Sequence, residues 1–113
     1  MNTPHTASDS SHVQHSGASS LLDSVLYRNA FGTPGMRQVF SDHALLQRCI
    51  EVEVALASAQ ARCGIVPTEA AQAIAQHARF DRLDLSNLGQ ETHLVGYPVL
   101  PLVHQLTEMC GPA

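Results

Sequence analysis

The sequence predicts an all-α fold, with about four helices following a disordered N-terminal tail. Apolar residues between positions 42 and 63 recur at spacings of three and four, which is the period of a helix. Capping residues, glycines and prolines divide the rest of the chain into segments of helical length. No segment alternates apolar and polar residues in the manner of a strand. With 113 residues, the chain is long enough for one small domain.

Residues 1–20 are predicted to be a disordered tail, because this stretch contains almost no large apolar side chain. Such a composition buries too little apolar surface to offset the entropy lost on ordering. Residues 21–113 would then form the helical domain. A domain of this size is marginal on its own, since small chains bury a smaller fraction of their surface. The size therefore indicates a partner surface or a longer polypeptide.

Short local elements are expected before the main helix. Residues 21–31 form a short amphipathic segment, and the sequence Gly32-Thr33-Pro34-Gly35 is typical of a turn. A brief helical turn is predicted over residues 36–40.

The strongest helix is predicted to run from about Asp42 to Cys63. Ser41 or Asp42 is a suitable N-cap, and Gly64 is suited to end the helix. The apolar arc is wide and rich in alanine, which indicates contact with more than one neighbouring helix. It consists of a main stripe, Leu45, Cys49, Val52, Leu56, Ala59 and Cys63, and of the flanking residues Leu46, Ile50 and Ala57.

Three shorter helices are expected downstream. Pro67 or Thr68 opens the first of them, with Pro67 suited to the first helical position. Asp84 is placed to cap the second, which Gly96 ends. Pro101 falls in the first turn of the third, where its missing N–H costs little. The three helices are predicted over residues 68–78, 85–95 and 98–110, with a break at residues 81–84 between the first two.

The composition excludes several classes of function. Net charge is −4, and only six lysines and arginines are present, so binding to nucleic acid is not expected. The sequence contains no run of about 18 apolar residues that would span a membrane. Its beginning also lacks the basic and apolar regions of a secretory signal. We therefore expect a cytoplasmic protein.

The cysteines and histidines predict neither a disulfide framework nor a metal site. If Cys49 and Cys63 share a helix, they lie about 21 Å apart, too far for a disulfide. Together with Cys110 they make an odd count, typical of reduced thiols in a reducing compartment. No HExxH or CxxC spacing occurs among the seven histidines and three cysteines. The tail histidines His5, His12 and His15 would bind Zn²⁺ or Ni²⁺ only adventitiously.

Glu53 and Gln60 are polar residues within the apolar arc of the long helix, seven positions apart. A carboxylate in an apolar environment needs a partner. One hypothesis makes Glu53 a catalytic or substrate-orienting carboxylate. The other makes the two residues a buried hydrogen-bonding pair that ties the helix to a neighbour's backbone or caps. We favour the structural hypothesis.

Tyr97 and Arg28 are the candidates for contact with a ligand. Tyr97 lies where a loop becomes a helix, and helix N-termini attract carboxylates and phosphates. The alternative is a tyrosine that packs its ring and hydrogen-bonds its hydroxyl. Arg28 and Arg37 flank the Gly-Pro turn, and either is able to hold a carboxylate through two hydrogen bonds. Surface arginine is the commoner explanation for each.

Four short motifs occur together in a recognisable order. They are Met36-Arg37 with Phe40-Ser41-Asp42, Glu53-x-Ala55-Leu56-Ala57-x-Ala59-Gln60, Gly64-Ile65-Val66-Pro67 with Glu69-Ala70-Ala71, and Gly96-Tyr97-Pro98-Val99. Over about residues 25 to 110 the chain resembles the N-terminal domain of the fumarase/aspartase superfamily. It is most similar to the branch of adenylosuccinate lyase and 3-carboxy-cis,cis-muconate cycloisomerase.

The resemblance implies a homotetramer built on a helical bundle, without a cofactor. The implied substrate is a small di- or tricarboxylate, from which a base abstracts a proton beside a carboxylate. In this family the base is a serine in a Gly-Ser-Ser-x-Met-Pro loop, and a His-x-Gly-x-Thr-Ser-x-Asp motif binds substrate. Neither motif occurs here. We therefore expect no catalytic residue within this chain, and no activity from it alone.

Only one family position is carried over directly. Tyr97 takes the place of a substrate-pocket histidine in the Gly-His-Asp-Val segment of adenylosuccinate lyases. This departure favours the cycloisomerase-like branch, with 3-carboxy-cis,cis-muconate cycloisomerase as the best single guess. Arg28 is a loose counterpart of pocket arginines near the N-terminus of adenylosuccinate lyases. The alternative function is a small helical interaction or oligomerisation module without catalysis, which would use the alanine-rich arc.

Overall fold

The computed structural model describes residue 17 and residues 19–111, so most of the predicted tail over residues 1–20 lies outside the described residues. The all-α prediction is confirmed, because the described residues form helices and turns without a strand. The elements are α1 (Arg28–Phe31), α2 (Pro34–Val39), α3 (Asp42–Arg62), α4 (Thr68–His77), the 3-10 turn η1 (Phe80–Arg82), α5 (Leu85–Val95) and α6 (Val99–Cys110). The chain divides into two compact units, residues 1–37 and 38–113.

In the first unit, most of the short amphipathic segment over residues 21–31 forms hydrogen-bonded turns, with α1 at its end. The Ser24 hydroxyl accepts hydrogen bonds from the backbone N–H groups of Leu26 and Tyr27, at 3.2 and 3.3 Å. These local bonds hold residues 24–27 in a turn, and α1 begins only at Arg28. Arg37 then donates from Nη1 to the Arg28 carbonyl at 3.0 Å.

The ends of α3 form as the sequence predicts. At its start, the Ser41 hydroxyl accepts a hydrogen bond from the Ala44 N–H at 3.1 Å, which satisfies one of the free donors of the first turn. At its end, the N–H groups of Gly64 and Ile65 donate to the carbonyls of Ala61 and Gln60, at 3.1 and 2.9 Å. This is the Schellman pattern, which requires the positive φ of +72° at Gly64.

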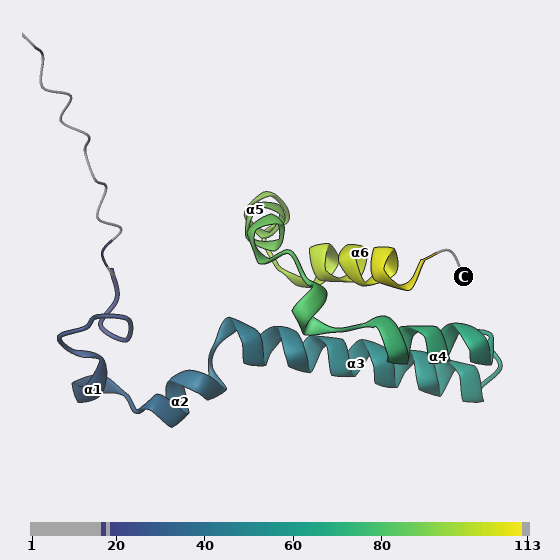
Figure 1. The fold of residues 1–113 in the computed structure, drawn as a ribbon, viewed down its shortest axis with the longest axis horizontal. Coiled ribbons are helices and arrows are strands. Elements are labelled where there is room, and N and C mark those ends of the chain that lie inside the picture. The colour runs from purple at the N-terminus through teal and green to yellow at the C-terminus, as the bar shows by residue number, and fades with distance from the viewer. Residues whose placement is uncertain (1–16, 18, 112–113) are drawn as a thin grey trace, which may run out of the picture. The chain divides into compact units, whose positions relative to one another are not determined.

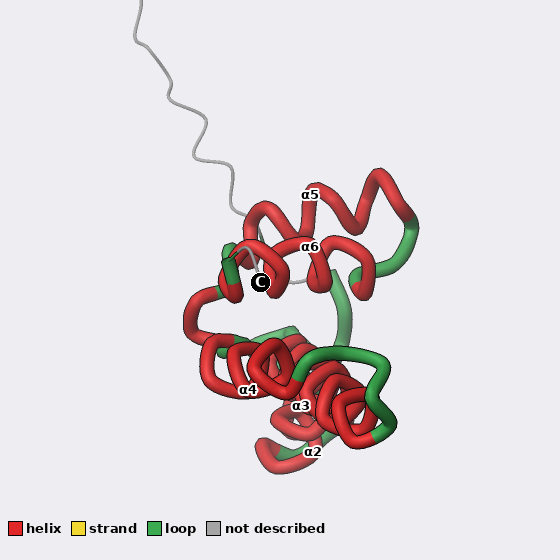
Figure 2. Tube along the Cα trace, turned by 90° about the vertical axis from the view of Figure 1, so that its right-hand side faces the viewer, coloured by secondary structure: helices red, strands yellow, loops and turns green. Residues whose placement is uncertain are grey.

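The second unit is a helical hairpin with two further helices beside it. α3 and α4 lie side by side and antiparallel (Figures 1 and 2). The turn η1 leads from α4 to α5, and its Phe80 ring lies on the His43 ring of α3, with centroids 4.0 Å apart. α5 is seen nearly end-on in Figure 1, and it lies next to α6 in both views (Figures 1 and 2). The predicted boundaries of α5 and α6 agree with the structure within one residue.

The core is small and joins α3, the end of α4, α5 and α6. Its most buried residue is Leu102 of α6, with no exposed surface. The buried residues of this cluster are Leu46, Ile50, Ala78, Leu88, Leu102 and Leu106.

The main apolar stripe expected on α3 is not the buried one. Leu45, Val52 and Leu56 are 52%, 63% and 49% exposed, whereas the flanking residues Leu46 and Ile50 are 6% and 3% exposed. A wide apolar arc does not itself determine which of its edges meets a neighbour. In the second unit, α4, η1 and α6 pack against one edge and leave the other uncovered.

Candidate functional site

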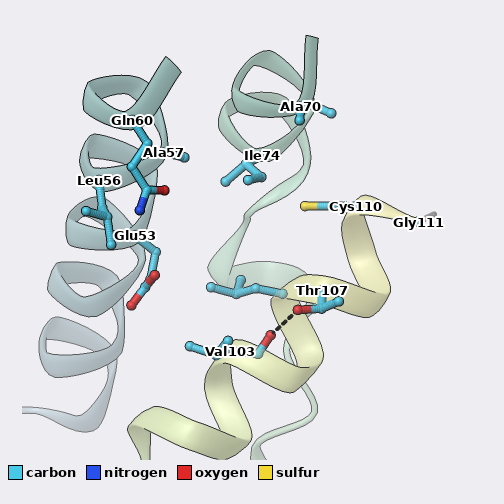
Figure 3. A pocket seen from close by; sticks show the side chains of 12 residues that line it. Glu53, Leu56, Ala57, Gln60, Ala70, Ile74, Val103, Thr107, Cys110 and Gly111 are labelled. Carbon is cyan, nitrogen blue, oxygen red and sulfur yellow. Dashed lines mark hydrogen bonds between the residues drawn. The ribbon is translucent and has the colours of Figure 1, made fainter. Parts of the chain in front are cut away.

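A groove of about 490 Å³ lies between α3, α4 and α6 (Figure 3). Apolar side chains form most of its surface. Its walls are Glu53, Leu56, Ala57 and Gln60 from α3, Ala70, Ala73 and Ile74 from α4, and Val103, Leu106, Thr107, Cys110 and Gly111 at the end of α6. The two polar residues singled out in α3 therefore do share one surface, as their seven-residue spacing predicts.

Glu53 and Gln60 are half-buried along the α3 wall of this groove. Figure 3 shows both side chains on the side of α3 that borders the groove. Within the part of the chain that the structure describes, neither side chain makes a hydrogen bond or a salt bridge. The expected bonds to a neighbour's backbone are therefore not formed by these residues, and the role of the pair stays a prediction.

Tyr97 is 50% exposed and directly precedes Pro98, the N-cap of α6. It does not line the groove, which takes its α6 residues from Val103 onward. Because α6 has 12 residues and is about 18 Å long, Tyr97 lies at the opposite end of this helix from Cys110. The structure thus places Tyr97 and the pair Glu53 and Gln60 at separate positions within the second unit.

Arg28 belongs to the first unit, where its side chain is used in local bonding. Its Nη2 donates to the Asp23 carbonyl at 3.2 Å, and its own carbonyl accepts from Arg37 Nη1. The Nε atom of Arg28 is buried without a hydrogen-bond partner. Arg37 also reaches the Asn29 Oδ1 with its Nη2, at 3.5 Å. The Arg37 side chain therefore bonds across the turn, whereas the Arg28 side chain bonds to the preceding Asp23.

The described residues contain no group of three histidine, cysteine, aspartate or glutamate side chains placed to bind a metal ion. The tail histidines His5, His12 and His15 lie outside the described residues. Cys49, Cys63 and Cys110 are free thiols, of which Cys63 is exposed and the other two are half-buried. Between residues 19 and 111, no helix has the combined length and apolar character needed to cross a membrane.

Sequence reasoning missed two features of the second unit. One is the contribution of α4 and α6 to the groove, through Ile74, Val103 and Thr107. The other is Gln105, whose amide bonds to the backbone of Asp84. Both depend on contacts between helices far apart in the sequence, and no local pattern indicates them.

Comparison with known proteins identifies the family, although no protein-family model matches the chain. The chain is 38% identical over 96 residues to N-acetyl-S-(2-succino)cysteine lyase of Dickeya dadantii, covering 85% of this chain and 21% of the relative. It is 41% identical over 92 residues to 3-carboxy-cis,cis-muconate cycloisomerase of Acinetobacter baylyi, covering 80% of this chain and 20% of that relative. A crystal structure of fumarate lyase from Mesorhizobium sp. BNC1 superposes with a TM-score of 0.65 at 48% identity, covering 68% of this chain and 18% of that one.

The chain belongs to the fumarase/aspartase superfamily. This confirms both the resemblance predicted from its four motifs and the helical fold that the resemblance implies. The chain spans about a fifth of the length of the superfamily relatives that it matches.

Proposed function

We propose that this chain is the N-terminal part of a lyase or cycloisomerase that acts on a small di- or tricarboxylate. The reaction would be proton abstraction beside a carboxylate, with 3-carboxy-cis,cis-muconate as the preferred substrate. The observation that supports this most is the 41% identity over 92 residues to the Acinetobacter cycloisomerase. Tyr97 at the pocket position, in place of histidine, agrees with that branch.

In this proposal the chain supplies binding residues but no catalytic base. Tyr97 would contact substrate beside the N-terminus of α6, and Arg28 would bind a substrate carboxylate. The serine loop and the histidine-containing motif of the family are absent from the sequence, so the 113-residue chain alone would be inactive. The full-length protein would be a cytoplasmic homotetramer that requires no cofactor.

The experiment compares the longer natural polypeptide that contains this segment with the 113-residue chain. Each is assayed with 3-carboxy-cis,cis-muconate, by loss of the diene absorbance, and with N-acetyl-S-(2-succino)cysteine, by release of fumarate. We expect the longer polypeptide to turn over carboxymuconate in preference, as a tetramer, and the short chain to turn over neither. Turnover of the succino compound alone would refute the substrate assignment, and turnover by the short chain would refute its inactivity.

The second candidate is a helical interaction or oligomerisation module without catalysis. The exposed apolar residues Leu45, Val52 and Leu56 on α3 favour it, because a patch of this kind commonly marks a protein contact. A module should fold alone and run at a defined oligomeric mass in sedimentation. An isolated piece of an enzyme should instead bind hydrophobic dyes and aggregate.

A further inference from the structure

The groove between α3, α4 and α6 is an incomplete interior. Leu56 and Ile74 lie on two of its walls, and the half-exposed side chain of Leu56 extends its apolar surface toward the uncovered edge of α3. A partner that buried this surface would gain about 25 cal/mol of favourable free energy for each Å² of apolar area removed from water. A segment that packed here would bury this apolar surface against α3, α4 and α6.

The last described residue belongs to this groove. Gly111 ends α6 and is itself one of the lining residues, together with Cys110. Figure 3 shows the Cys110 sulfur directed from α6 into the space between the helices. A polypeptide that continues from Gly111 therefore starts at the rim of the groove. The relatives are much longer than the matched part, which makes up 20% or 21% of their length.

We propose that this groove is the docking site for the polypeptide segment that follows residue 113 in the full-length protein. The inference rests on the proposed function, in which this chain is one part of a longer lyase. A segment directly adjoining residue 113 would need only a short connection, so its closure onto the groove would cost little loop entropy. A second copy or an unrelated protein would pay the larger entropic cost of association.

The chemistry of the walls specifies what the segment must carry. Apolar side chains would face Ile74 and Val103, because these residues present only carbon to the groove. A lysine, an arginine or another donor would face Glu53, whose half-buried carboxylate otherwise stays unpaired among the described residues. Gln60 would offer an amide to a backbone group of the segment.

The three cysteines provide the first test. Cys110 reports on the groove, the exposed Cys63 serves as a reference, and Cys49 beside the core reports on helix packing. Each thiol is labelled with maleimide, and its rate is read by peptide mass spectrometry, in the 113-residue chain and in the longer polypeptide. We expect the Cys110 rate to fall at least about tenfold in the longer polypeptide, with the Cys63 rate changed less than about twofold.

Three results would overturn the proposal. Equal Cys110 rates in the two polypeptides would show that the continuation leaves the groove open. If the Cys110 labelling rate of the short chain falls as the protein concentration rises, a second copy occupies the groove. Slow labelling at every concentration would show that another part of the same short chain occupies it. If Cys49 reacts as fast as Cys63 in the short chain, its helices are unpacked, and the next experiment decides.

The second test uses only the longer polypeptide. A benzophenone amino acid replaces the exposed Thr107, which lines the groove, and the captured peptide is sequenced after illumination. The control carries the same group at the exposed His104, which does not line it. The proposal predicts that position 107 captures residues beyond 113 of the same chain. A mixture of isotope-labelled and unlabelled protein distinguishes capture within one chain from capture of a second copy. Capture of a second copy, or of residues before 42, would overturn it.

These readouts do not depend on catalysis. Protection of Cys110 in a polypeptide that turns over no carboxylate substrate would leave the docking site standing and refute the proposed function. An active lyase with a freely reactive Cys110 would refute the docking site alone.

Discussion

The side-chain amide of Gln105 pairs with the backbone of Asp84 in both directions. Its Oε1 accepts from the Asp84 N–H at 2.9 Å, and its Nε2 donates to the Asp84 carbonyl at 3.1 Å. The same Nε2 lies 3.1 Å from the Asn87 Oδ1. Because Asp84 caps α5 through the Asn87 N–H, Gln105 ties α6 to the point where α5 begins.

Replacing Gln105 with leucine should therefore destabilise the chain. Two backbone groups of Asp84 lose their partner, at a cost of about 1 kcal/mol each, less if water replaces the amide. Urea unfolding followed by circular dichroism measures this change. The matched control is Gln90→Leu, at an exposed position of α5, for which we expect a change within about 0.5 kcal/mol. Equal effects of the two substitutions would contradict the assigned role.

Removing the cap of α3 should have a comparable effect. Ser41→Ala deletes the acceptor for the Ala44 N–H and is expected to cost about 1 kcal/mol of stability. Ser58→Ala, at an exposed position within the same helix, should be neutral or slightly stabilising, because alanine has the higher helix propensity. Thermal unfolding of the two variants side by side tests the difference, and a harmless Ser41→Ala would count against the cap.

Alanine substitutions at two glycines should change the stability of the chain in opposite directions. Gly64 has a φ of +72°, so Gly64→Ala should cost about 1 kcal/mol through backbone strain alone, since a Cβ there meets nothing within 4 Å. Gly89 lies inside α5 without a positive φ and with equally open space. Gly89→Ala should therefore stabilise by about 0.5–1 kcal/mol. Midpoints of urea unfolding that shift in the same direction would disprove this account.

Alanine substitutions in the core and on the uncovered face of the second unit should destabilise the chain to different extents. Leu102→Ala removes a side chain with no exposed surface and should cost about 2–5 kcal/mol, enough to unfold a marginal domain. Leu45 is 52% exposed, so Leu45→Ala in the 113-residue chain should cost well under half as much. Hydrogen exchange of the α6 amides provides the measurement. A larger loss from Leu45→Ala would mean that its face is already covered in the isolated chain.

The proposed contact of Tyr97 with substrate predicts a selective loss of activity. Tyr97→Phe in the full-length protein should lower kcat/KM about tenfold, because a hydrogen bond to a charged substrate group is lost. Stability should not change, since the hydroxyl is unpaired among the described residues. Tyr27→Phe, the same change at the other tyrosine, should leave kinetics intact. An unaltered kcat/KM in Tyr97→Phe would remove this residue from the site.

Features that depend on neighbouring residues were determined by the sequence itself. Ser41 caps α3, Gly64 ends it and Asp84 caps α5, as predicted, because each acts on backbone groups within a few positions. The four motifs likewise indicate the superfamily from the sequence alone.

Only the tertiary structure decided which edge of α3 is buried. Leu45 and Leu46 are equally apolar and adjacent, and their burial differs because α4, η1 and α6 pack on one side of the helix. The pairing of Gln105 with Asp84 and the three-helix groove beside Glu53 arise in the same way, between residues distant along the chain. Local periodicity specifies that a helix has an apolar arc, but packing between helices selects the part of the arc that leaves water.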